Sequence, residues 1–256
     1  MQKLFLGLII VCLGIALLVP VLSASAREQH WYCKRNAEHK QPTLDGEFSY
    51  IEQYGGIYVD KNHGDSCDDK VIYLTFDVGY ENGNVKRIID VLKDEGVKGS
   101  FFILGNVIDK EPELVKRMAD DGHLVCNHTL THQNLTGKEE SVLVNEIKAL
   151  ENAYKNLTGK EMSKYFRPPE GTFDKEMLQR VNALGYKTVF WSFAYADWDN
   201  DKQMSSDKAM QKILDNIHNG EIMLLHPTSQ TNADIMQSLI RELKAQGYRF
   251  ATLDEM

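Results

Sequence analysis

Short apolar runs alternate with amphipathic segments from Val71 to the C-terminus. The apolar runs are continuously hydrophobic, which is typical of parallel strands covered on both faces. A glycine follows most of the segments with helical periodicity, as a helix C-cap does. The pattern predicts strands at 71–76, 97–103, 123–127, 164–166, 186–193, 221–225 and 248–252. It predicts helices at 84–95, 107–121, 139–156, 174–184, 206–218 and 232–246, with capping glycines at Gly96, Gly122, Gly159, Gly185, Gly220 and Gly247.

Six or seven β-α units of this kind predict an α/β fold with a parallel sheet. A closed or nearly closed (β/α) barrel of about seven units accounts for their number better than an open sheet. Residues 27–70 are polar and irregular, and we expect an N-terminal extension packed on the barrel. No Gly/Ser-rich or Pro-rich linker interrupts the 256 residues, which favours one main domain at 71–256.

The N-terminus carries the features of an export signal. Lys3 precedes an apolar run from Leu4 to Leu22, and Ala24-Ser25-Ala26 follows as a small-residue cleavage site. The pattern predicts a signal peptide at 1–26 and export across the cytoplasmic membrane, to the cell wall. The run of 19 residues is close to a membrane span, so an uncleaved anchor stays open. Any membrane contact would then lie in this segment.

Charge and cysteine content narrow the partners and the compartment. The net charge of −8, without any basic block, argues against a nucleic-acid partner. Cys12 lies in the predicted signal, which leaves Cys33, Cys67 and Cys126, and an odd number excludes a complete disulfide set. We expect Cys126 to be a buried thiol. Pairing of Cys33 with Cys67 stays open.

Polar residues follow several of the predicted strands. The carboxyl ends of parallel strands meet at one face of a barrel, and barrel enzymes keep their catalytic residues there. We therefore expect an active site from residues of different strands and their loops. The candidates are Asp77, His128, His132, Arg167, Glu170, Gly171, Asp197, Trp198 and His226.

Two candidates have the spacing of metal ligands. In a helical turn, His128 and His132 would lie on one face, as a metal-binding pair requires. Neutral imidazole accepts zinc, cobalt, nickel or iron, so the metal is not specified. Arg167 precedes two prolines that restrict the backbone, a suitable place from which to keep a carboxylate such as Asp77 ionised. The alternative for Asp77 is a structural N-cap of the next helix.

The remaining candidates fit proton transfer and sugar binding. Asp197 would fix the tautomer of His226 and favour its protonated form. The structural alternative for His226 is a hydrogen-bonded core histidine. Trp198 is either a core residue or a platform for a sugar ring.

The stretches "TFDVG", "HTLTH", "RPPEG", "DW" and "LLH", in this order and spacing, resemble the five motifs of the polysaccharide deacetylases. This carbohydrate esterase family has the NodB-homology domain, a distorted (β/α) barrel of about seven units, and the similarity covers Val71 to the C-terminus. More narrowly, "WYCKRNAEHKQP" at 31–42 and "YLTFDVGYENG" at 73–83 resemble the branch of endospore formers that makes muramic δ-lactam in cortex peptidoglycan.

The resemblance implies roles for the candidate residues. The family's general base corresponds to Asp77, its metal-binding histidines to His128 and His132, the residue that orients the base to Arg167, and the general acid with its partner to His226 and Asp197. A backbone N–H in the turn 168–171 would stabilise the oxyanion. Substrate contacts would come from Tyr80, Glu170, Gly171 and Trp198.

One position departs from the family pattern. Val78 stands where the family usually has a second aspartate, which is a metal ligand. Losing that ligand would weaken the binding of zinc or a similar divalent ion by at least about 10- to 100-fold, the loss seen even for outer-shell partners. The δ-lactam branch is similar in lacking this aspartate, so the departure fits the branch.

The resemblance implies hydrolytic de-N-acetylation of N-acetylmuramic acid in peptidoglycan, with release of acetate during sporulation. The enzyme would act at the cell wall or forespore envelope, after an amidase has removed the stem peptides. Two alternatives stay open: an N-acetylglucosamine deacetylase of peptidoglycan or chitin-like glycan, and a catalytically inactive cell-wall glycan-binding protein. A glycoside hydrolase using Asp77 and Asp197 is weaker, because the histidine pair and Arg167 would then have no role.

Overall fold

The computed structural model describes residues 27–35 and 38–256. The predicted signal peptide, with Cys12, lies outside the described residues, and export stays a prediction. Within the described ranges, no helix combines the length and the apolar character needed to cross a membrane.

A curled, almost entirely parallel sheet of eight strands forms the barrel, in agreement with the predicted fold class. The strand order is β10-β3-β4-β5-β6-β8-β2, and β9 pairs with β3 as well. The strands of this sheet are β2 (Gly56–Ile57), β3 (Lys70–Val78), β4 (Ser100–Ile103), β5 (Leu124–Asn127), β6 (Tyr165–Phe166), β8 (Lys187–Val189), β9 (Glu221–Leu225) and β10 (Tyr248–Ala251). A separate antiparallel pair consists of β1 (Gln29–His30) and β7 (Thr172–Phe173).

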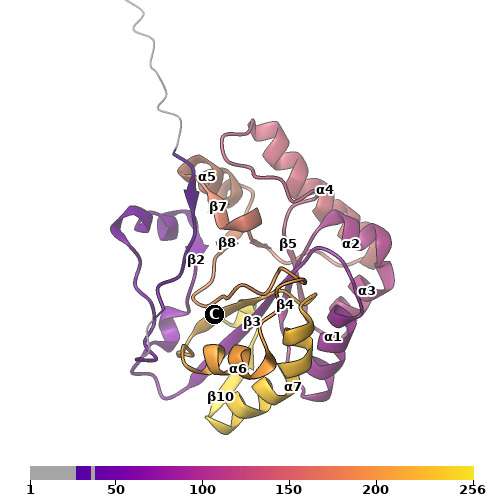
Figure 1. Cartoon of the computed structure of the whole chain (residues 1–256). Helices are drawn as coiled ribbons and strands as arrows, with labels where there is room; N and C mark the ends of the chain where they lie inside the picture. The colour runs from indigo at the N-terminus through magenta and orange to yellow at the C-terminus, as the bar shows by residue number, and fades with distance from the viewer. Residues whose placement is uncertain (1–26, 36–37) are drawn as a thin grey trace, which may run out of the picture.

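Helices cover the outside of the sheet, with α1 to α4 on the side opposite the N-terminal extension (Figure 1). The helices are α1 (Asn84–Asp94), α2 (Gly105–Lys110), α3 (Pro112–Asp120), α4 (Glu140–Thr158), α5 (Lys175–Ala183), α6 (Ser206–Leu214) and α7 (Gln230–Ala245). The six glycines predicted as caps all have positive φ. Gly159, for example, ends α4 at φ 71° and donates its N–H to the carbonyl of Lys155, a conformation that costs little without a Cβ. Gly220 is nevertheless not a helix cap, because the helix predicted at 206–218 ends at Leu214 and Gly220 directly precedes β9.

The alternation of side chains along β3 separates the core from the catalytic face. Leu74, Phe76 and Val78 lie in the large hydrophobic cluster that includes α1 and α7. Tyr73 belongs to a separate, smaller cluster, which also contains Cys126, buried as predicted. Because the side-chain period of a strand is two, Asp77 lies on the same side as Tyr73, at the carboxyl end of the strand.

The N-terminal extension supplies a strand to the sheet. Residues of β2 pair in parallel with β8, and Val59 forms an antiparallel bridge to Glu221 at the start of β9. Trp31 packs on Phe190, with ring centroids 4.5 Å apart, and donates its indole N–H to the carbonyl of Trp191. The extension therefore helps to close the barrel where the segment after β8 meets β9 at the isolated bridge between Phe193 and Met223.

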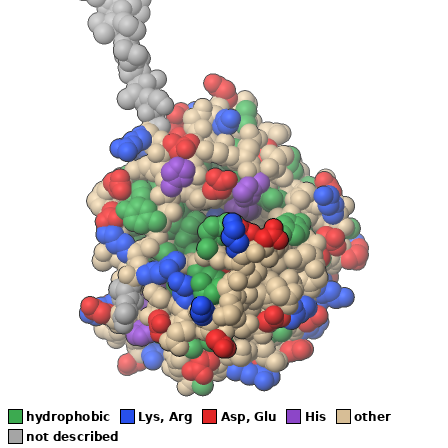
Figure 2. Space-filling view, in the orientation of Figure 1, with side chains coloured by type: hydrophobic (Ala, Val, Ile, Leu, Met, Phe, Trp, Pro, Cys, Tyr) green, Lys and Arg blue, Asp and Glu red, His purple; other side chains and the backbone are tan. Residues whose placement is uncertain are grey.

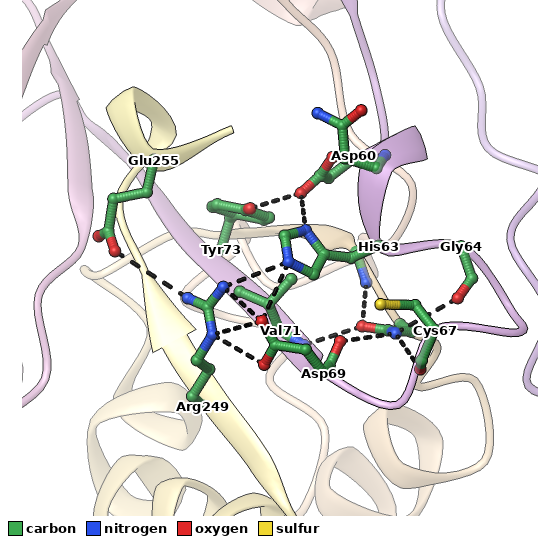
Figure 3. A network of polar contacts seen from close by, with 12 residues as sticks. Asp60, His63, Gly64, Cys67, Asp69, Val71, Tyr73, Arg249 and Glu255 are labelled. Carbon is green, nitrogen blue, oxygen red and sulfur yellow. Dashed lines mark hydrogen bonds and ion pairs between the residues drawn. The ribbon is translucent and has the colours of Figure 1, made fainter.

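A polar network attaches the end of this extension to the barrel (Figure 3). It lies toward the start of β3, whereas Asp77 lies at the carboxyl end of that strand. The imidazole of His63 contacts the carboxylates of Asp60, at 2.5 Å, and of Asp69, at 3.1 Å. Asp60 is buried and accepts a 2.6 Å bond from the Tyr73 hydroxyl, and Arg249 of β10 pairs with Asp69. The network thus joins the extension to both β3 and β10.

The structure differs from the sequence-based expectations at three further places. The helix predicted at 107–121 is broken at Glu111, whose φ of −129° is not helical, and α3 begins with Pro112. The strand predicted at 186–193 is only three residues long, because the chain beyond Val189 leaves the ladder with β6. Cys33 and Cys67 do not pair and are free thiols.

Candidate active site

A cavity of about 770 Å³ opens at the carboxyl ends of the strands. On this face, hydrophobic side chains surround a hollow that has histidine side chains at its edge (Figure 2). Eight of the ten residues named from the sequence line it: Asp77, Tyr80, His128, His132, Glu170, Gly171, Trp198 and His226. The other two, Arg167 and Asp197, are buried and hydrogen-bond to Asp77 and His226.

Asp77 is held by a fully buried cation. Arg167 Nη1 donates to Asp77 Oδ1 at 2.8 Å, and Nη2 donates to the hydroxyl of Thr75 at 2.9 Å. Burial alone would raise the pKa of Asp77, but the charges of Arg167 and the nearby histidines more than offset it, and the pKa lies below its ordinary value. Asp77 is therefore an oriented carboxylate at neutral pH, and α1 is preceded by Gly83, which excludes Asp77 as its N-cap.

His128 and His132 lie together, but not on a helical turn as predicted. Residues 128–132 form an irregular loop in which Thr129 and His132 have φ of 74° and 62°. This loop brings the two imidazole rings to a centroid distance of 5.0 Å. The i, i+4 spacing therefore identified the pair, while the backbone conformation that joins the rings differs.

The two imidazoles fit a divalent metal ion. His128 Nδ1 lies 2.8 Å from the carbonyl of Arg167, which makes Nδ1 the protonated nitrogen and leaves Nε2 a lone pair, 3.6 Å from Asp77 Oδ2. Burial lowers the pKa of His128 to about 4, so the ring is neutral, as a metal ligand must be. Val78 lies in the core cluster instead and offers no ligand. Among the described residues, no group of three or more His, Cys, Asp or Glu side chains is placed to hold a metal.

His226 forms an acid pair with Asp197 across the cavity. Its Nδ1 lies 2.7 Å from Asp197 Oδ1, and its backbone N–H donates to Oδ2 at 2.8 Å. Burial alone would lower the pKa of His226, but the hydrogen bond and charge of Asp197 raise it above its ordinary value. His226 lines the cavity and is therefore placed to donate a proton there, so it is not a core histidine.

The turn after β6 places two candidates at the cavity wall. Glu170 has φ 58° and Gly171 has φ 67°, an unusual conformation for a glutamate. A Cβ on Gly171 would lie 2.7 Å from the ring of Trp191, so only glycine allows this close approach. Pro168 and Pro169 carry no N–H, and Gly171 N–H donates to the carbonyl of Pro168 at 3.1 Å. In this turn, the backbone N–H of Glu170 is therefore the donor that can bind a ligand.

Two aromatic residues form the rim of the cavity. Trp198 is 61% exposed and Tyr80 is 47% exposed, and the amide of Asn200 donates to the Tyr80 hydroxyl at 2.6 Å. Exposed aromatic rings beside a polar cavity suit stacking on sugar rings. Trp198 is thus not a core residue, the alternative left open by the sequence.

The structure adds two buried polar residues that the sequence did not indicate. Asn232 of α7 is fully buried and donates to Asp197 Oδ2 at 2.6 Å, while its own carbonyl accepts the hydroxyl of Tyr195. Glu146 of α4 is buried and binds the loop that carries His132. Both stand at core positions of amphipathic helices, and a polar residue at such a position was the one sequence pattern that could have indicated them.

A parallel (β/α) barrel with an oriented carboxylate, a histidine paired with an aspartate and a second pair of histidines at one end has the groups that a barrel hydrolase needs. The chain belongs to the polysaccharide deacetylase family, whose sequence model "Polysaccharide deacetylase" matches residues 64–189. Deacetylases of this carbohydrate esterase family are generally metal-dependent.

The most similar relatives include deacetylases of peptidoglycan. The chain is 38% identical to the peptidoglycan-N-acetylmuramic acid deacetylase PdaA of Bacillus subtilis, over 89% of this chain and 85% of that protein. The solved structure of PdaA superposes with a TM-score of 0.83, covering 89% of this chain and 96% of the other. A peptidoglycan-N-acetylglucosamine deacetylase of Bacillus cereus is 33% identical over 82% of this chain and 74% of the relative.

Proposed function

We propose that this chain removes the N-acetyl group of N-acetylmuramic acid in peptidoglycan and releases acetate. The observation that carries the proposal is a single cavity with both a base, Asp77 held by Arg167, and an acid, His226 held by Asp197. The choice of muramic acid over glucosamine rests on the higher identity and coverage of the match to PdaA.

In the proposed reaction, Asp77 takes a proton from a water molecule that attacks the acetamide carbonyl carbon. Arg167 keeps this carboxylate ionised and fixes its orientation. The N–H of Glu170 donates to the developing oxyanion. His226 then gives its proton to the leaving nitrogen as the C–N bond breaks, so the products are acetate and the free amino sugar.

A divalent ion, zinc or a similar metal, would be held by His128 and His132 and would act as a Lewis acid on the carbonyl and the water. Both rings line the cavity beside Asp77. Because Val78 replaces the usual carboxylate ligand, we expect binding to be weaker than in relatives that keep it.

The proposed substrate also defines the place of action. Peptidoglycan lies outside the cytoplasmic membrane, so the chain would work at the cell wall or forespore envelope, in sporulation. An amidase that removes stem peptides would act first, as the resemblance to the δ-lactam branch implies.

Acetate release from peptide-free glycan strands tests the proposal. We expect release by the unsubstituted chain and a loss of about 100- to 10,000-fold in Asp77→Asn, which leaves the water without a base. Asp94→Asn, at the exposed end of α1, is the matched control and should retain full activity. Glycan binding without acetate release by the unsubstituted chain would instead identify a binding protein.

A further inference from the structure

The loop between His128 and His132 has a backbone conformation that a peptide does not adopt by itself. Thr129 is β-branched and has φ 74°, and His132 has φ 62°. Such a conformation is unfavourable for residues other than glycine and persists only where surrounding contacts enforce it. Within the loop, Asn127 Oδ1 accepts the N–H of Thr129 at 2.9 Å, and the Thr129 hydroxyl accepts the N–H of His132 at 2.8 Å.

Glu146 of α4 supplies the contacts from outside the loop. Its Oε2 accepts the backbone N–H of Thr131 at 2.9 Å. Its Oε1 accepts the Thr131 hydroxyl at 2.9 Å and the side-chain amide of Gln133 at 2.7 Å. Its backbone carbonyl also accepts the N–H of Leu130, at 3.1 Å. One residue of α4 therefore holds the positions on both sides of His132.

The burial of this carboxylate needs an explanation beyond packing. Glu146 is only 3% exposed, and its three side-chain donors are all neutral groups. A carboxylate is costly to bury, and hydrogen bonds to the charged form offset that cost only where the donors are fixed. Its neighbours on the buried face of α4, Leu143 and Ile147, are apolar. A leucine at position 146 would continue that face but could not hold the loop.

We propose that Glu146 is a positioning residue for His132, which keeps the second imidazole beside His128 and so sets the affinity of the cavity for a divalent metal ion. The proposal rests on the histidine pair of the proposed function and deepens it. Second-sphere groups that orient a metal ligand typically contribute about 10- to 100-fold in metal affinity.

Calorimetric titration of the full chain with Zn²⁺, without substrate, tests this role. We expect Glu146→Leu to bind zinc about 10- to 100-fold more weakly. Glu146→Gln, which can still accept from Thr131 N–H, should stay within about 3-fold, as should the control Glu140→Gln in the exposed first turn of α4. In a His132→Ala background, Glu146→Leu should cause no further loss, because the imidazole that it positions is gone.

Two milder variants keep the test decisive if Glu146→Leu does not fold. Thr131→Val and Gln133→Leu each remove one bond to Oε1, and each should weaken zinc binding several-fold. Unchanged zinc affinity in these variants, an additive loss in the His132→Ala background, or no zinc binding by the unsubstituted chain would overturn the proposal. A chain that binds zinc as expected but releases no acetate would refute the proposed function alone.

Discussion

Replacement of Arg167 by methionine should destabilise the fold by leaving a charge unpaired. Arg167 is fully buried and also donates Nε–H to the carbonyl of Val189 at 3.1 Å, and the side chain of Asp77 is 11% exposed. Removing one partner of a buried ion pair costs about 3–5 kcal/mol, because the remaining charge stays desolvated. We expect this loss in the free energy of unfolding for Arg167→Met, and a similar one for Asp77→Leu.

The double variant Arg167→Met/Asp77→Leu removes both charges and should lose less than the sum of the single variants, by about 2–3 kcal/mol. Urea unfolding at pH 7 measures all four free energies. The exposed pair of Arg180 and Glu176 on α5 is the matched control, with an expected coupling below about 0.5 kcal/mol. Additivity within about 0.5 kcal/mol at the buried pair would refute the reasoning. Acetate release should be lost in all three variants.

Three further predictions concern pH and substrate. Because Asp197 raises the pKa of His226, the activity of the unsubstituted chain should fall only above the ordinary histidine pKa. In Asp197→Asn the effect of burial is no longer offset and lowers the pKa of His226. The alkaline limb of the kcat/KM profile should then move to lower pH. An unmoved limb would exclude His226 as the acid. Burial raises the pKa of Glu221 well above its ordinary value, so the folded state favours the protonated carboxyl group. The contribution of Glu221 to the free energy of unfolding is therefore complete below about pH 4.5. Above that pH it decreases, by at most about 1.4 kcal/mol per pH unit. Glu221→Gln should remove this dependence of the free energy of unfolding on pH, measured by urea unfolding between pH 5 and 8. The same pH dependence in the variant and in the unsubstituted chain would contradict the prediction. Trp198→Ala should raise KM several-fold with little change in kcat, whereas a selective loss of kcat would place the ring at the reacting bond.

The sequence was sufficient for the barrel and for most of the cavity because both follow from local patterns. Continuous apolar runs indicate parallel strands, and a polar residue that follows such a run must lie at the same edge as its counterparts. Asp77 lies at the carboxyl end of β3, and His226 directly follows β9. The motif resemblance then supplied the roles of residues such as Tyr80, which periodicity alone does not identify.

What the sequence did not predict depends on contacts between distant segments. The conformation of the loop at His132 depends on Glu146. The orientation of the Asp197 carboxylate depends on Asn232, which is 35 residues away. Local propensity carries no information on such pairs, because each bond depends on the packing of α4 or α7 against the barrel.

Mass spectrometry of peptide-free glycan strands after incubation with the chain tests the central claim most directly. The account predicts the loss of acetyl groups from muramic acid and not from glucosamine, with Asp77→Asn inactive. Loss from glucosamine alone, or no loss with or without added zinc, would contradict it.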